Sequence, residues 1–187
     1  MYSTSDIRNG LKVEIDGQPY MVTYFQFVKP GKGCAFTRTK LKNMLSGNML
    51  DRTYKTGESL EPADITDATF QYLYEDGEYF HFMNTETFDQ LPMEPKAVGD
   101  AKNFLVEQME VNVMFFRGNP VSIDLPNFVE LQINYTEPGV KGNTAQGATK
   151  PATLTTGHTV NVPLFVENEE WLKIDTRTGE YVERARR

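Results

Sequence analysis

The sequence is poor in cysteine and histidine and contains no long apolar run. Its single cysteine, Cys34, excludes an internal disulfide framework and fits a reducing compartment. No apolar run reaches the roughly 18 residues that a membrane-spanning helix needs. The start, MYSTSDIRNG, also lacks the basic and apolar regions of a secretion signal. We therefore expect a cytoplasmic protein that makes no contact with a membrane.

The residue types of most active sites are also scarce. His81 and His158 fall in separate predicted domains, so a shared metal site or proton relay is not expected. The motif PGKGC is not a phosphate-binding P-loop, because no Ser or Thr follows its Gly-Lys pair. We expect no catalytic residue, no metal and no cofactor. A thiol enzyme that uses Cys34 is the remaining enzymatic hypothesis, although no histidine base is evident beside it.

Charge is unevenly distributed along the chain. The formal net charge of −7 argues against a protein that coats nucleic acid indiscriminately. From Gly17 to Leu50, however, there is no acidic residue and there are five basic ones, whereas residues 51–187 carry 23 acidic and 12 basic residues. One basic end on an acidic chain can orient the protein against a polyanion.

Short strands joined by tight turns dominate the pattern. Four hairpin signals lie at Asp16-Gly17, Asp76-Gly77, Arg117-Gly118 and Thr178-Gly179, each between runs rich in β-branched and aromatic residues. One short helix is expected at about 102–110 or in the stretch before it. Breaks at Glu61-Pro62 and Pro126-Asn127 divide the chain into three pieces of barrel size. The sequence therefore predicts an all-β fold of three small domains.

The segment VKPGKG places Lys32 between two glycines after a proline. Pro30-Gly31 suits the central positions of a type II turn, with a positive φ at Gly31. In the strand that follows, Arg38, Lys40 and Lys42 share parity, so an extended chain places them on one face, roughly 7 Å apart. A solvated loop beside a solvated strand face is the ordinary interpretation. The absence of acidic residues favours a polyanion contact, and the accessible lysine suits a modifying enzyme.

The quoted segments also carry a family resemblance. FVKPGKGCAF, LYEDGEYFHFMNTETFDQL, PNFVELQINYTEPGVKGNTAQGATKPATLTTG and VNVPLFV together resemble bacterial translation elongation factor P. The similarity runs over nearly the whole chain, from Asp6 to Val182. It implies an N-terminal SH3-like (KOW-type) barrel at 1–63, an OB-fold barrel at 64–127 and a second OB-fold barrel at 128–187. It also implies an elongated, tRNA-like arrangement of these domains.

The resemblance implies a function as well. Such a factor is a monomer that binds the 70S ribosome beside the P-site peptidyl-tRNA and relieves stalling at consecutive prolines, without being an enzyme. Lys32 matches the tip residue that a dedicated enzyme extends, often with a β-lysyl group. The expected contacts with the tRNA acceptor end and stem are Lys29, Pro30, Gly31, Lys32, Gly33, Arg38, Lys40 and Lys42. The expected contacts on the small-subunit side are Gly142, Asn143 and Thr144.

The chain departs from the family pattern at two positions in its last third, and one rival binding hypothesis stays open. Asn143 stands where the family usually has Asp, and Asn168 stands near a turn that often contains Gly. We expect Asn168 to tolerate a left-handed conformation there. The rival hypothesis is a general single-stranded RNA-binding protein that stacks bases on exposed aromatic residues such as Tyr24 and Phe36.

Overall fold

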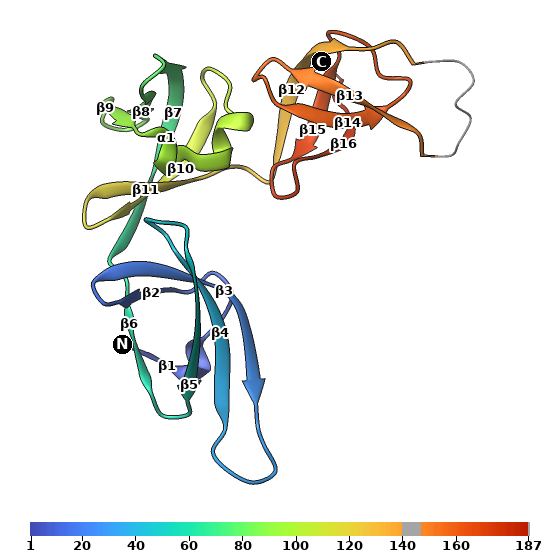
Figure 1. Ribbon diagram of the computed structural model, residues 1–187. Coiled ribbons are helices and arrows are strands. Elements are labelled where there is room, and N and C mark those ends of the chain that lie inside the picture. The colour runs from blue at the N-terminus through green and yellow to red at the C-terminus, as the bar shows by residue number, and fades with distance from the viewer. Residues whose placement is uncertain (140–146, 187) are drawn as a thin grey trace. The chain divides into compact units, whose positions relative to one another are not determined.

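The computed structural model describes residues 1–139 and 147–186, most of them in β-strands (Figure 1). Within these residues the strands form three sheets. The all-β class predicted from the sequence is therefore confirmed. The chain divides into two compact units, Met1–Ala68 with Val113–Ser122, and Thr69–Asn112 with Ile123–Arg187. The boundaries at 63 and 127 and the tRNA-like arrangement stay predictions.

The first sheet has six strands and lies in the first unit. Its spatial order is β1 (Tyr2–Ser3), β6 (Ser59–Pro62), β2 (Lys12–Ile15), β3 (Gln18–Val28), β4 (Phe36–Asn43) and β5 (Met49–Lys55). The turn between β2 and β3 has φ of 52° at Asp16 and 75° at Gly17. Two positive φ angles match the right-handed twist of the flanking strands, so this predicted hairpin is confirmed.

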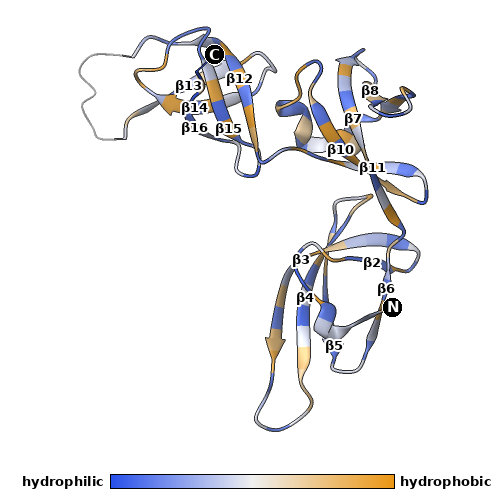
Figure 2. Cartoon of the chain, turned by 180° about the vertical axis from the view of Figure 1, so that it is seen from behind, coloured by the Kyte–Doolittle hydropathy of each residue, from blue (hydrophilic) through white to orange (hydrophobic). Residues whose placement is uncertain are grey.

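Alternation along β4 explains how the first sheet covers its core. Thr37, Thr39, Leu41 and Asn43 are buried, while the residues between them point away from the core. Figure 2 shows bands of hydrophobic and hydrophilic colour along β3 and β4. The core beneath it consists of seven buried residues, Ile7, Val13, Ile15, Val22, Leu41, Tyr54 and Leu60. A period of two is what a strand with one solvated face requires.

The middle sheet has five strands. Their order is β11 (Asn119–Asp124), β10 (Glu110–Phe116), β7 (Ile65–Glu75), β8 (Phe80–Asn84) and β9 (Gln90–Met93). Arg117 and Gly118, between β10 and β11, have φ of 49° and 82°. Asp76 and Gly77 lie in the four-residue connection between β7 and β8. Both predicted hairpins are therefore confirmed.

Helical structure is limited to short segments among the described residues. They are η1 (Thr4–Asp6), α1 (Pro95–Val98) and η2 (Gly99–Asn103). The second of the two predicted locations, the stretch before 102–110, is therefore correct, and residues 104–109 are not helical. None of these described helices is long and apolar enough to cross a bilayer.

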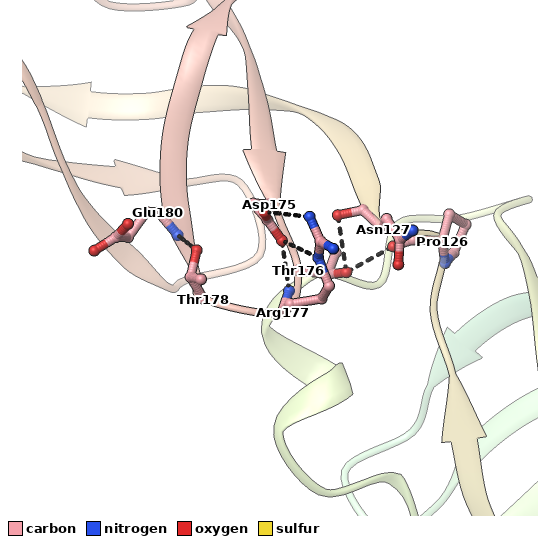
Figure 3. Close-up of polar contacts among 7 residues, drawn as sticks. All are labelled: Pro126, Asn127, Asp175, Thr176, Arg177, Thr178 and Glu180. Atoms are coloured by element: carbon pink, nitrogen blue, oxygen red, sulfur yellow. Dashed lines mark hydrogen bonds and ion pairs between the residues drawn. The ribbon is translucent and has the colours of Figure 1, made fainter. Parts of the chain in front are cut away.

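The third sheet also has five strands and lies in the second unit. Its order is β14 (Thr159–Pro163), β13 (Thr149–Leu154), β12 (Phe128–Thr136), β15 (Trp171–Asp175) and β16 (Glu180–Arg184). The turn after β15 is fixed by an ion pair of 2.9 Å between Arg177 and Asp175 (Figure 3). In the same turn Thr176 Oγ1 donates to the Pro126 carbonyl at 2.6 Å. The predicted hairpin at Thr178-Gly179 is therefore confirmed and anchored to the chain before β12.

The turn at Asp76 leads to a prediction about acid stability. The Asp76 carboxylate accepts hydrogen bonds from Tyr79 N at 2.7 Å, from the His81 ring at 2.7 Å and from Glu78 N at 2.9 Å. These bonds, that from Tyr79 first, lower the pKa of Asp76 from 3.8 to about 2. Because the folded pKa lies below the unfolded one, the stabilisation is present above pH 3.8 and is lost as pH falls through 2. Asp76→Asn should therefore flatten the loss of stability in that window.

The measurement is urea unfolding at pH values between 5 and 2, together with the pKa of Asp76 from its carboxyl ¹³C shift. Asp89→Asn is the matched control, because the Asp89 carboxylate forms no hydrogen bond with a described residue. Equal acid sensitivity of the two variants would contradict the assignment.

Candidate nucleic-acid interface

Lys32 lies in the loop of seven residues, 29–35, that joins β3 to β4. Lys32 is exposed, as are its neighbours Gly31, Gly33 and Cys34. Within the described part of the chain, the Lys32 ammonium forms no hydrogen bond or ion pair. An unpaired cation at the end of a hairpin is free to meet a negatively charged or electron-rich group on another molecule.

The predicted conformation of this loop is wrong in one detail. Gly31 does not have a positive φ, so Pro30-Gly31 does not form a type II turn. The positive φ is at Gly33, at 112°, where a side chain would be strained. The second strand starts at Phe36, three residues after Gly33. The loop is therefore wider than a tight turn.

Arg38, Lys40 and Lys42 share the outer face of β4, as their parity predicts, and all three are exposed. The Arg38 guanidinium lies over the Phe36 ring, 5.5 Å from its centroid. No ion pair joins any of the three to a carboxylate among the described residues. We call this set the basic stripe. Its spacing and exposure suit contacts with successive phosphates of a nucleic acid backbone.

Strand pairing adds neighbours to the basic stripe that were not identified from the sequence. Asp51 on β5 is the register partner of Lys40, so one carboxylate does reach this face. Tyr24 on β3 is the partner of Lys40 on the other side and is 49% exposed, whereas Phe36 is only partly exposed. Which residues of β5 lie on the same face as the basic stripe depends on the register between β5 and β4. The sequence of either strand alone does not specify that register.

Gly142, Asn143 and Thr144, the predicted contacts on the small-subunit side, lie outside the described residues. The residues that flank them are tightly held. A Cβ at Gly139 would come within 2.5 Å of the Leu164 carbonyl oxygen, so only glycine fits there. The buried Lys150 donates from its ammonium to the Glu137 carbonyl at 2.6 Å.

Asn168 does not adopt the expected left-handed conformation. The positive φ falls one residue later, on Glu169, at 64°. The side-chain oxygen of Asn168 instead accepts a hydrogen bond of 2.6 Å from Thr136 N. This amide therefore joins the turn before β15 to the end of β12.

The other titratable candidates do not form a recognisable catalytic site. Cys34 is a free, exposed thiol. His81 pairs with Asp76 at 2.7 Å, and His158 packs edge-on against Phe104 at 5.5 Å. Over the described ranges, no group of three or more His, Cys, Asp or Glu side chains is arranged to hold a metal ion.

Comparison with known proteins covers all three sheets. The family models that match are the "Elongation factor P (EF-P) KOW-like domain" at residues 3–60, the "Elongation factor P (EF-P) OB domain" at 65–123 and "Elongation factor P, C-terminal" at 129–184. The first two models name the KOW-like and OB domain types that the sequence resemblance implied for the N-terminal and middle pieces, and the third is the family's C-terminal model.

Whole-chain relatives agree with these matches. The chain is 53% identical over 185 residues to elongation factor P from two strains of Clostridium botulinum, Eklund 17B and Alaska E43. In each case the alignment covers 99% of this chain and 100% of the relative. A solved structure, eukaryotic translation initiation factor 5A from Methanococcus jannaschii, matches with a TM-score of 0.51 and 22% identity. That match covers 66% of this chain and 93% of the other, and it supports the fold alone.

Proposed function

The chain belongs to the elongation factor P family, and on that premise we propose that it binds beside the P-site peptidyl-tRNA and speeds peptide bond formation. It is a translation elongation factor that acts with the ribosome, and we further propose that it relieves stalling at consecutive prolines. The observation that carries this proposal is Lys32, an exposed cation without a described partner, at the end of a hairpin with a basic face.

The proposed mechanism is positioning. The proline ring fixes φ and restricts the geometry in which the chain can react. A factor that holds the peptidyl-tRNA end in a reactive arrangement lowers the entropic part of the barrier. Lys32, or a modified form of it, would lie along the acceptor end and transfer no proton. The protein is thus a ligand of the ribosomal catalyst and not itself an enzyme.

The basic stripe indicates which face of this hairpin would lie against the tRNA. Arg38, Lys40 and Lys42 would contact phosphates of the acceptor stem, with Lys29 at the start of the loop. The piece spanning 1–63 carries nine basic and six acidic residues, whereas 64–127 carries three basic and twelve acidic residues. Strong negative charge on the middle piece disfavours phosphate contacts there. The charge distribution therefore favours RNA contact through the N-terminal domain.

Two further contacts belong to the same proposal. Gly142, Asn143 and Thr144 would approach the small subunit on the anticodon side. An enzyme that extends Lys32 would find it unobstructed, because both neighbouring residues are exposed glycines. The protein would act as a monomer in the cytoplasm, where ribosomes and their tRNAs are found.

Salt dependence of ribosome binding tests the role of the basic stripe. Each phosphate contact contributes about 0.7 to 0.9 to the slope of log K against log salt concentration. The double variant Lys40→Gln, Lys42→Gln should therefore reduce the slope by about 1.5. The measurement is equilibrium binding to 70S ribosomes carrying P-site peptidyl-tRNA, at several salt concentrations.

The matched control is Lys96→Gln with Lys102→Gln, which removes two exposed lysines from the acidic middle piece. Its slope should equal that of the unmodified sequence. An equal reduction in both double variants would contradict the proposal. Comparable affinity for any single-stranded RNA at physiological salt would instead favour the rival RNA-binding function, which the exposed Tyr24 supports.

A further inference from the structure

The basic stripe uses one face of the hairpin of β3 and β4, and the opposite face covers the core: Thr37 and Thr39 are buried there, and Phe25 packs against the core cluster. Near the loop this opposite face becomes exposed again, at Phe27. Phe25 and Phe27 on β3 pair in register with Thr39 and Thr37 on β4, and directly paired residues lie on the same face of a sheet. Arg38 belongs to the face of the basic stripe. Phe27 is 60% exposed, and its ring makes no aromatic contact with another described residue.

Two guanidinium groups lie against rings on this opposite face. The Arg8 guanidinium is 5.9 Å from the centroid of the Phe25 ring. The Arg52 guanidinium is 5.2 Å from the centroid of Tyr54, and Arg52 is the register partner of Thr39. We call Arg8, Phe25, Phe27 and Arg52 the stacking face. No carboxylate among the described residues pairs with either arginine.

The stacking face is organised before any ligand binds. Arg8 donates from one guanidinium nitrogen to the Ile7 carbonyl at 2.6 Å and to the Ser5 carbonyl at 3.1 Å. Tyr54, beneath Arg52, is buried. The Arg8 guanidinium is therefore held by the fold and loses little freedom on binding, while the Arg52 guanidinium lies over a ring that is itself fixed in the core. The end of β3 near the loop is coloured as hydrophobic in Figure 2.

The alternation of aromatic rings and guanidinium groups indicates the class of ligand. Unpaired nucleotides stack their bases on aromatic rings and place their phosphates near arginines. Arg8 has the Asp6 carboxylate nearby, but an apolar protein surface would leave Arg52 without a counter-charge, and burial of unpaired charge is costly. The N-terminal piece, with nine basic and six acidic residues, also favours a polyanion.

We propose that the stacking face binds a short stretch of unpaired RNA, with one base stacked on Phe27 and the adjoining phosphates at Arg8 and Arg52. Near the loop, where Phe27 is exposed, the hairpin would then contact RNA on both sides, with phosphates along the basic stripe and an unpaired base on the stacking face. This site requires neither Lys32 nor a ribosome. Its failure can therefore be distinguished from failure of the proposed function.

Hexaadenylate is the probe, and its binding to the full chain is measured at low salt by fluorescence anisotropy of a labelled oligonucleotide. Loss of one base stack on Phe27→Ala should weaken binding roughly ten-fold or more. Phe27→Tyr, which keeps an aromatic ring, should bind as the unmodified sequence does. Because Phe27 is largely exposed, the substitution should leave the fold intact.

Phe88→Ala is the matched control, since Phe88 is 68% exposed and lies in the acidic middle piece. It should leave hexaadenylate binding unchanged. A second readout uses Phe27→Trp with Trp171→Phe, which places the chain's single tryptophan on the stacking face; hexaadenylate should quench its fluorescence. The proposal is overturned if Phe27→Ala binds like Phe88→Ala. It is also overturned if Phe27→Leu retains full affinity, which would indicate an apolar contact of the kind a protein makes.

Discussion

Replacing Lys32 with alanine is expected to abolish rescue of ribosomes stalled at consecutive prolines while leaving the protein folded. The Lys32 side chain is exposed and pairs with no described residue, so its removal should change the free energy of unfolding by less than about 0.5 kcal/mol. Its proposed role is to hold the reacting end of the peptidyl-tRNA. Loss of about 3 kcal/mol of transition-state stabilisation slows a reaction roughly 150-fold.

The measurement is the yield of a reporter that contains a run of prolines, in a translation system supplied with each variant. A reporter without the run is the substrate control, and Lys96→Ala, at an exposed lysine of the middle piece, is the protein control. The reporter without the run should give the same yield with every variant. Lys96→Ala should rescue the proline-run reporter as fully as the protein without a substitution does. Full rescue by Lys32→Ala would refute the proposed role of this residue.

Lys32→Arg separates charge from modification. Arginine keeps the positive charge but offers no ε-amine for acylation. If a modified lysine is required, Lys32→Arg should fail as Lys32→Ala does; if charge suffices, it should retain rescue. The intact mass of the protein from its native host, followed by localisation of any added mass to Lys32, tells which case applies.

Much of the candidate interface could be predicted because it depends on local rules. Asp16-Gly17 and Arg117-Gly118 formed the expected hairpins, since positive φ at both turn residues matches strand twist. The basic stripe followed from the parity of β4 alone. These inferences required nothing from elsewhere in the chain, and the structure agrees with each of them.

Features that depend on pairing between distant strands were not predicted. Asp51 lies opposite Lys40, and Arg52 lies on the same face as Phe25, because β3, β4 and β5 pair in one particular register. A one-residue shift in register would reverse both faces. The positive φ at Gly33 instead of Gly31 has a related cause. The loop must span the separation of β3 and β4, and its conformation follows from that closure and not from the preference of Pro-Gly.

Phe104→Ala is expected to destabilise the second unit by about 3 to 5 kcal/mol. Phe104 follows η2 and is only 5% exposed. It belongs to the buried cluster that the third sheet forms, together with Leu131, Leu154 and Leu172. The predicted domain boundary at 127 places Phe104 in the middle domain, yet its side chain completes the core of the C-terminal one. Truncation would leave a cavity in that core.

Polar contacts hold the same junction in place. Thr156 Oγ1 donates to the Asn103 carbonyl at 2.7 Å, beside the Phe104 ring. Thr176 donates to the carbonyls of Pro126 and Asn127, as Figure 3 shows. The segment around Phe104 and the third sheet should therefore unfold together, because the loss of either one exposes the same buried surface.

Urea unfolding followed by tryptophan fluorescence measures this effect, since Trp171 on β15 is the only tryptophan and reports on the third sheet. Phe104→Ala should lower the midpoint markedly. Phe88→Ala, which removes an exposed ring from the same unit, should shift the free energy of unfolding by less than about 0.5 kcal/mol. Because Phe104 lies outside the first unit, circular dichroism should show the β-structure of that unit persisting after the fluorescence transition. Equal midpoints for the two variants would show that the C-terminal sheet is stable without Phe104, and that 128–187 folds as an independent domain.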